Sequence, residues 1–291
     1  MTAFELLLEP LQYDFMLRAI ATAVLAATVC ALLSCWLVLI GWSLMGDAVS
    51  HAVLPGVVIA YMFGAPFALG ATVFGVLAVI LIGTVRDTSR VKEDAAIGVV
   101  FTVLFALGLV MVSTTPSHID LNHVVYGNVL GISMGDLVQV AILAFAAGAV
   151  LLLKHRDLTL FAFDPAQAQA IGLSPKALGA LLLGALAITA VMSLQVVGVV
   201  LVVAMLVIPG ATAYLLTDRF KHMLAIAPAV AICSAIIGVY MSYWLDASSG
   251  GLVVVTMGAC FALAYLFSPI QGIVPRWLQR RSKRRAAAAP A

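Results

Sequence analysis

Apolar runs long enough to cross a lipid bilayer recur along almost the whole chain. A membrane-spanning helix needs about 20 mostly apolar residues, and hydrophobic residues make up 64% of this sequence. Charged residues make up only 10%, whereas a soluble domain carries about 25%. Backbone polar groups must be satisfied inside a bilayer, and helices do this within one segment. The sequence therefore predicts an all-α polytopic membrane protein with about eight or nine transmembrane helices.

Nine candidate spans can be drawn on the sequence by this criterion. They are residues 15–40, 47–64, 66–85, 94–114, 134–153, 174–194, 196–216, 220–244 and 249–270. The second and third are the weakest candidates, because they are short and only Gly64-Ala65-Pro66 separates them. No connection is long enough for a soluble domain, so we expect one transmembrane domain over residues 1–275. The basic tail, residues 276–291, is expected to be disordered. We expect its cations to contact anionic membrane lipid rather than nucleic acid.

Helix-breaking residues lie inside two of these spans. Pro55 is expected to kink its helix and to free the carbonyl of His51, because a proline ring clashes with the carbonyl four residues before it. Pro209-Gly210 is expected to interrupt the span 196–216. Broken helices are common where transport proteins line a pathway, although close helix packing uses the same small residues.

The basic residues are distributed unevenly between the two sides of the predicted bundle. If nine spans alternate, all but Arg18 of the 15 lysines and arginines fall on one side. Basic residues concentrate in cytoplasmic loops. We therefore expect a cytoplasmic C-terminus and an outside N-terminus.

One acidic residue of the 13 in the chain, Asp47, lies well inside an apolar run, and His51 follows one helical turn later. Ionisable side chains at membrane depth are costly and usually functional, and residues at i and i+4 share a helical face. Three interpretations stay open: divalent metal ligands, a structural hydrogen-bonded pair, and a proton relay. Two ligands do not complete a metal site, so we also consider Ser43, Ser50, Met45, Met205 and the His51 carbonyl.

A second, weaker group of candidate metal ligands lies in the longest outside loop. His118, Asp120 and His123 could receive a metal ion that arrives from outside. Solvated loop polarity explains the same residues equally simply.

A short cytoplasmic helix is predicted at about 165–171, within a segment of about 163–173. Asp164 is a good N-cap and Pro165 suits the first helical position, while Gly172 suits the C-terminal stop. The helix surface is small and apolar, with Ala166 and Ile171 on it. It either docks into a groove of another protein or is a plain connector on the bilayer surface.

The sequence offers little support for a catalytic role. It contains no Gly-Lys dipeptide and therefore no Walker A loop for ATP, and HExxH does not occur. A stand-alone proton-coupled transporter would need further deep acidic residues, and a membrane metalloenzyme would need a fuller ligand set. The chain is thus expected to be non-catalytic.

Four sequence blocks carry a resemblance to a known family. They are residues 46–56, 120–131, 170–174 and 207–213. In these blocks the chain resembles the ABC-3 family, the permease subunits of bacterial ABC importers for manganese, iron or zinc. The order of segments is also similar to type II ABC importer permeases.

The resemblance implies a concrete assembly in the bacterial cytoplasmic membrane. Two copies of the chain would form the ion pathway, with Asp47 and His51 as its transient metal site. A separate cytoplasmic ATPase would dock on the helix marked by Asp164, Pro165, Ala166, Ile171 and Gly172. An extracytoplasmic metal-binding protein would deliver the ion. The pattern of residues 120–123 favours Mn²⁺ or Fe²⁺ as the transported metal, with Zn²⁺ as the alternative, and no permanently bound cofactor is expected.

Overall fold

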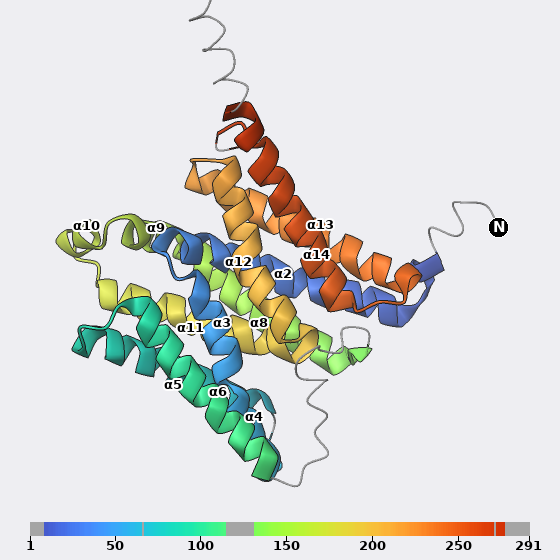
Figure 1. Ribbon diagram of the computed structural model, residues 1–291, viewed down its shortest axis with the longest axis horizontal. Coiled ribbons are helices and arrows are strands. Elements are labelled where there is room, and N and C mark those ends of the chain that lie inside the picture. Colours follow the sequence, from blue (N-terminus) through green and yellow to red (C-terminus); the bar gives the residue numbers. More distant parts are fainter. Residues whose placement is uncertain (1–8, 66, 115–130, 271, 277–291) are drawn as a thin grey trace, which may run out of the picture.

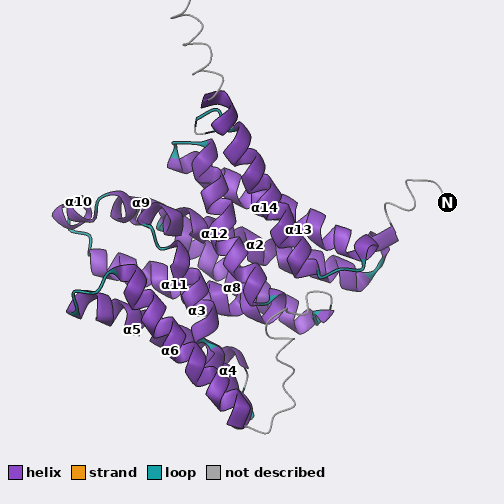
Figure 2. Cartoon of the chain, in the orientation of Figure 1, coloured by secondary structure: helices purple, strands orange, loops and turns teal. Residues whose placement is uncertain are grey.

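We describe the protein from a computed structural model, over residues 9–65, 67–114, 131–270 and 272–276. Within these residues the secondary structure is helical (Figure 2), as the sequence predicts. The elements are η1 Glu9–Gln12, α2 Asp14–Ile40, α3 Ser43–Ala52, α4 Leu54–Met62, α5 Phe67–Thr88, α6 Glu93–Thr114, α8 Met134–Leu153, α9 His155–Phe163, α10 Pro165–Ala170, α11 Pro175–Val197, α12 Val199–Leu216, α13 Phe220–Leu245 and α14 Ser249–Phe267.

The helix α2 forms the centre of the bundle (Figure 1). It packs against α8, α11, α12 and α13. Its buried side includes Ala19, Ala23, Ala27 and Ala31, all fully buried. Small side chains let helices approach closely, which is how membrane helices gain contact energy without a hydrophobic driving force.

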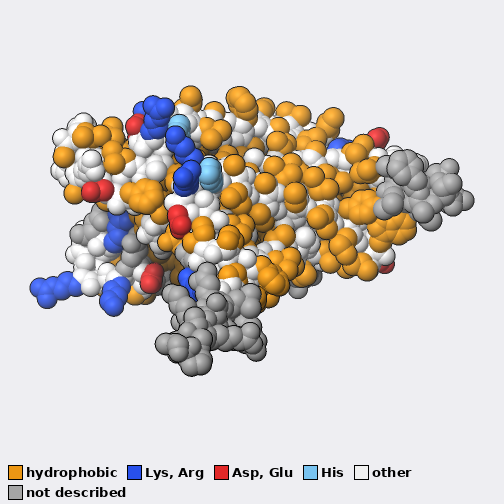
Figure 3. Space-filling view, turned by 90° about the horizontal axis from the view of Figure 1, so that it is seen from above, with side chains coloured by type: hydrophobic (Ala, Val, Ile, Leu, Met, Phe, Trp, Pro, Cys, Tyr) orange, Lys and Arg blue, Asp and Glu red, His pale blue; other side chains and the backbone are white. Residues whose placement is uncertain are grey.

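Eight described segments are long and apolar enough to cross a membrane, and a shorter apolar helix covers Val200–Leu216. They match the nine predicted spans to within a few residues, apart from the start of the second, which begins at Ser43. Hydrophobic side chains cover much of the face seen in Figure 3. Among the large apolar residues of the protein, Phe145 and Leu153 are each 81% exposed. A soluble protein rarely exposes so much apolar surface, which suits contact with lipid.

The second span is broken, as Pro55 predicts. α3 ends at Ala52, α4 begins at Leu54, and Val53 lies between them. Proline has no amide hydrogen to donate to the His51 carbonyl, which accepts the Val53 amide instead. The break separates a half-span that carries Asp47 and His51 from an apolar half-span.

The expected interruption at Pro209-Gly210 is wrong. α12 continues through Pro209, and the break falls instead at Gly198, whose φ of 79° suits glycine. The fully buried Ser34 of α2 supports the proline turn from outside. Its hydroxyl accepts the Gly210 amide at 3.1 Å and donates to the Val207 carbonyl at 3.4 Å.

Ser34→Ala should lower the free energy of unfolding by about 1 kcal/mol, because it removes an interhelical hydrogen bond and leaves the Gly210 amide without this acceptor. The thermal midpoint of the purified protein in detergent would report the loss. Ser113→Ala is the matched control, since that exposed hydroxyl donates within its own helix to Val110. Equal midpoints for the two variants would contradict the bridging role.

Candidate functional site

Asp47 and His51 meet on one face of α3. The Nδ1 atom of His51 lies 3.1 Å from Oδ1 of Asp47 and 3.0 Å from the Asp47 carbonyl oxygen. The side chain of Asp47 is 37% exposed and that of His51 is 27% exposed. The predicted i,i+4 pair is therefore formed, and it faces an open side of the chain rather than the core.

Two aromatic rings of α6 flank the histidine. The centroids of Phe101 and Phe105 lie 5.5 and 5.3 Å from that of His51, both in edge-on orientation. Such pairs hold a ring in a fixed orientation. Sequence reasoning missed these residues. Their i,i+4 spacing was a signal, but only the packing of α3 against α6 brings them to His51.

The additional donors considered on α3 and α12 do not join the pair. Met45 and Met205 are 1% and 0% exposed and belong to the core. Ser50 is buried and donates its hydroxyl to the Gly46 carbonyl at 2.8 Å. Burial in the packed bundle accounts for these three residues, so the structure gives them no support as metal ligands.

The loop candidates His118, Asp120 and His123 lie outside the described residues. Among the residues that the structure does describe, no three or more His, Cys, Asp or Glu side chains group together as metal ligands. The described part of one chain thus offers a divalent ion the pair on α3.

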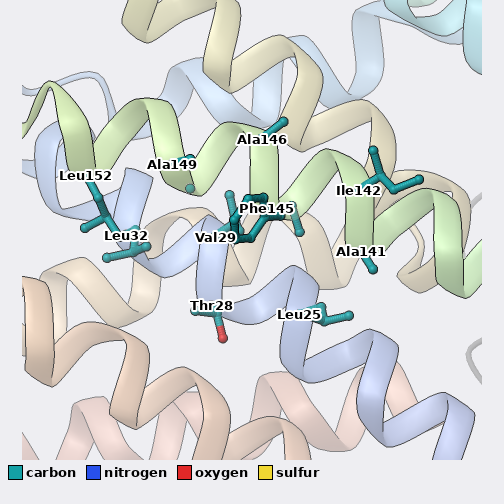
Figure 4. A pocket seen from close by; sticks show the side chains of 12 residues that line it. Leu25, Thr28, Val29, Leu32, Ala141, Ile142, Phe145, Ala146, Ala149 and Leu152 are labelled. Carbon is teal, nitrogen blue, oxygen red and sulfur yellow. The ribbon is translucent and has the colours of Figure 1, made fainter.

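An apolar groove near the bundle surface is of another kind. It lies between α2 and α8 (Figure 4) and encloses about 800 Å³. The side chains that line it, such as Leu25, Val29 and Phe145, are almost all apolar, and none is ionisable. It is a poor binding place for a cation.

The predicted short helix is present as α10, at one end of the bundle beside α9 (Figure 1). Asp164 accepts the Gln167 amide at 2.9 Å as N-cap. At the other end, Gly172 has a φ of 88° and donates to Gln169, and Leu173 donates to Ala168. These two backbone hydrogen bonds together form a Schellman motif. Most of the surface is exposed, including Ile171 at 62%.

A bundle of membrane-spanning helices with a broken span and an acidic–imidazole pair beside the break has the architecture of a transport permease. The chain belongs to the ABC 3 transport family, whose model matches residues 12–268. The resemblance seen in the sequence blocks is thereby confirmed.

Curated relatives are similar over nearly their whole length. The chain is 49% identical over 276 residues to the manganese transport system membrane protein MntB of Synechocystis sp., covering 95% of this chain and 90% of the relative. It is 44% identical to the chelated iron transport system membrane protein YfeC of Yersinia pestis, covering 97% and 96%.

A solved structure shares the fold. PsaBC from Streptococcus pneumoniae, in complex with Fab, superimposes with a TM-score of 0.85 at 32% identity. The match covers 96% of this chain and 99% of that chain. The chain is accordingly an ABC transporter permease subunit and a multi-pass protein of the bacterial inner membrane.

Proposed function

We propose that this chain is the membrane permease of an ATP-driven importer for manganese or iron, and that Asp47 and His51 bind the ion in the pathway. The observation that carries the proposal is their contact on a half-exposed face of a membrane-spanning helix. The relatives named for manganese and chelated iron support this choice over zinc. By general affinity order zinc would bind such ligands more tightly than manganese, so the delivery protein would contribute selectivity.

The incomplete ligand set supports a homodimer. Divalent ions take about four to eight ligands, and one described chain groups only two such side chains on α3. A second copy facing the first would double the donors. With no ion bound, Nδ1 of His51 and Oδ1 of Asp47 pair with each other. A site with few strong ligands also releases its ion readily, as conduction requires.

The remaining parts of the proposed assembly follow from the same family. A separate cytoplasmic ATPase supplies the energy by docking on α10, and an extracytoplasmic metal-binding protein delivers the ion. The end that carries α10 is then cytoplasmic and the N-terminus lies outside. Lys154 and Arg156 lie at the start of α9, which leads into α10, as the positive-inside rule expects. Residues 1–275 form one permease domain, and His118, Asp120 and His123 are secondary candidates for ion reception.

Uptake of radiolabelled manganese, iron and zinc tests this function directly. The cells would express the permease with its neighbouring ATPase and binding protein, or the permease alone. Manganese or iron uptake that requires the ATPase is the expected result. Uptake of zinc alone would overturn the choice of metal, and uptake by the permease without ATP would identify a stand-alone transporter.

Gly172→Ala should reduce uptake several-fold while metal binding stays unchanged. A side chain at this positive φ costs about 1–2 kcal/mol, which loosens the ending of α10 and the surface offered to the ATPase. Co-purification of the ATPase and uptake would be measured together. Gly184→Ala is the control, because a Cβ there meets no atom within 4 Å. Unchanged assembly and uptake in Gly172→Ala would remove the coupling role.

A further inference from the structure

A second pocket lies at the end of the bundle that carries α9 and α10. It encloses about 700 Å³ between α5, α9, α11 and the residue that precedes α3, Trp42. Its lining combines the cations of Arg86 and Lys176 with the rings of Trp42 and Phe161, and no lining residue is acidic. The proposed metal pathway does not use this pocket, since a transported cation would be repelled there.

The charged and apolar parts of the pocket lie at different membrane depths. Arg86 is in the last turn of α5 and Lys176 in the first turn of α11, so both are at ends of membrane spans. Ile80 and Leu183 line the pocket six and seven residues further along these helices. At 1.5 Å per residue they lie about 10 Å deeper. The pocket is therefore cationic at headgroup depth and apolar at acyl-chain depth.

The ring of Trp42 contacts the Arg86 side chain. The Arg86 guanidinium carbon lies 5.7 Å from the centre of the Trp42 ring, within the range of a cation–π contact. Trp42 is itself 5% exposed. The N-terminus of the long helix α11 adds a partial positive charge beside Lys176.

We propose that this pocket binds an anionic phospholipid, with the phosphate between Arg86 and Lys176 and the first part of an acyl chain along Ile80 and Leu183. Basic pockets between membrane helices are established sites for anionic headgroups. Free phosphate would use the same two cations but not the deeper apolar wall. The apolar wall favours the lipid, and the test separates the two ligands.

Native mass spectrometry of the transporter, assembled with its ATPase in detergent, measures this binding. The probes are phosphatidylglycerol, phosphatidylcholine and inorganic phosphate. We expect phosphatidylglycerol to bind preferentially, and Arg86→Gln with Lys176→Gln to weaken it by about thirtyfold. Ala180→Phe fills the pocket without a change in charge and should also displace the lipid.

Arg219→Gln with Lys221→Gln is the matched control. It removes the same charge from exposed positions outside this pocket, on either side of Phe220, whose ring contacts Trp36 and Phe163. Lipid binding close to that of the parent protein is expected. If the double variant at the pocket fails to assemble, Ala180→Phe and the exposed single variant Lys176→Gln decide the matter.

Three results would overturn the proposal. The first is equal phosphatidylglycerol binding by the parent protein and both pocket variants. The second is an equal loss in the control, which would indicate unspecific attraction to surface charge. The third is displacement of the lipid by inorganic phosphate at comparable concentration, which would identify a free-phosphate site.

Discussion

Asp47→Ala is expected to reduce manganese or iron uptake to the level of cells without the transporter, while the protein still folds and binds its ATPase. The side chain is 37% exposed and pairs with His51, so its removal leaves no cavity in the core. The substitution removes the one carboxylate of the proposed metal site on α3, whose other ligand is His51. His51→Ala should give the same result.

Uptake at limiting metal, with membrane levels of the permease checked in parallel, measures this effect. Asp14→Ala is a suitable control, because that carboxylate is exposed in the first turn of α2. Normal uptake by Asp47→Ala or His51→Ala would reject the proposed metal site. It would indicate that the two residues form a structural hydrogen-bonded pair.

Asp47→Asn tests whether Asp47 binds the ion itself or only orients His51. Metal-bound histidines commonly donate their second nitrogen to a carboxylate, and the contact between His51 Nδ1 and Asp47 has this form. Asparagine keeps an acceptor oxygen but loses the negative charge. We expect uptake to be lost, as for alanine. Retained uptake would mean that Asp47 orients His51 rather than binding the ion.

The second large effect concerns the contact between α4 and α5. A Cβ on Gly70 would lie 2.0 Å from the carbonyl oxygen of Gly56, which is backbone and cannot rotate away. Gly70→Ala must therefore push the two helices apart. We expect a loss of about 3 kcal/mol or more in the free energy of unfolding, with little permease reaching the membrane.

Gly83→Ala in the same helix isolates the steric cause. A Cβ at Gly83 meets no atom within 4 Å, and alanine is the better helix former by about 1 kcal/mol. The control should match or exceed the parent in thermal midpoint and expression. Similar midpoints for Gly70→Ala and Gly83→Ala would show that the helices separate without cost.

The sequence predicted the spans and the pair on α3 because both follow from local rules. Hydropathy locates a membrane helix, and the i,i+4 spacing alone places Asp47 beside His51. The ends of α10 were also predictable, since Asp164 and Gly172 act on their own helix. Each of these features needs no knowledge of neighbouring helices.

Features that depend on helix packing could not be predicted in this way. The aromatic flank of His51 requires α6, and the close approach of Gly56 and Gly70 requires the α4–α5 pairing. Pro209 was expected to break its helix on the basis of its own chemistry. Ser34, far away in the sequence, bridges the turn around it, and the helix continues.

The connection between α2 and α3 consists of Gly41 and Trp42. Both amides donate to the Leu37 carbonyl, at 3.1 and 2.7 Å, so this joint has little slack. It attaches the short helix that carries Asp47 and His51 directly to α2, the helix that packs against α8, α11, α12 and α13. We therefore expect a displacement of Asp47 to be transmitted through this short connection to α2.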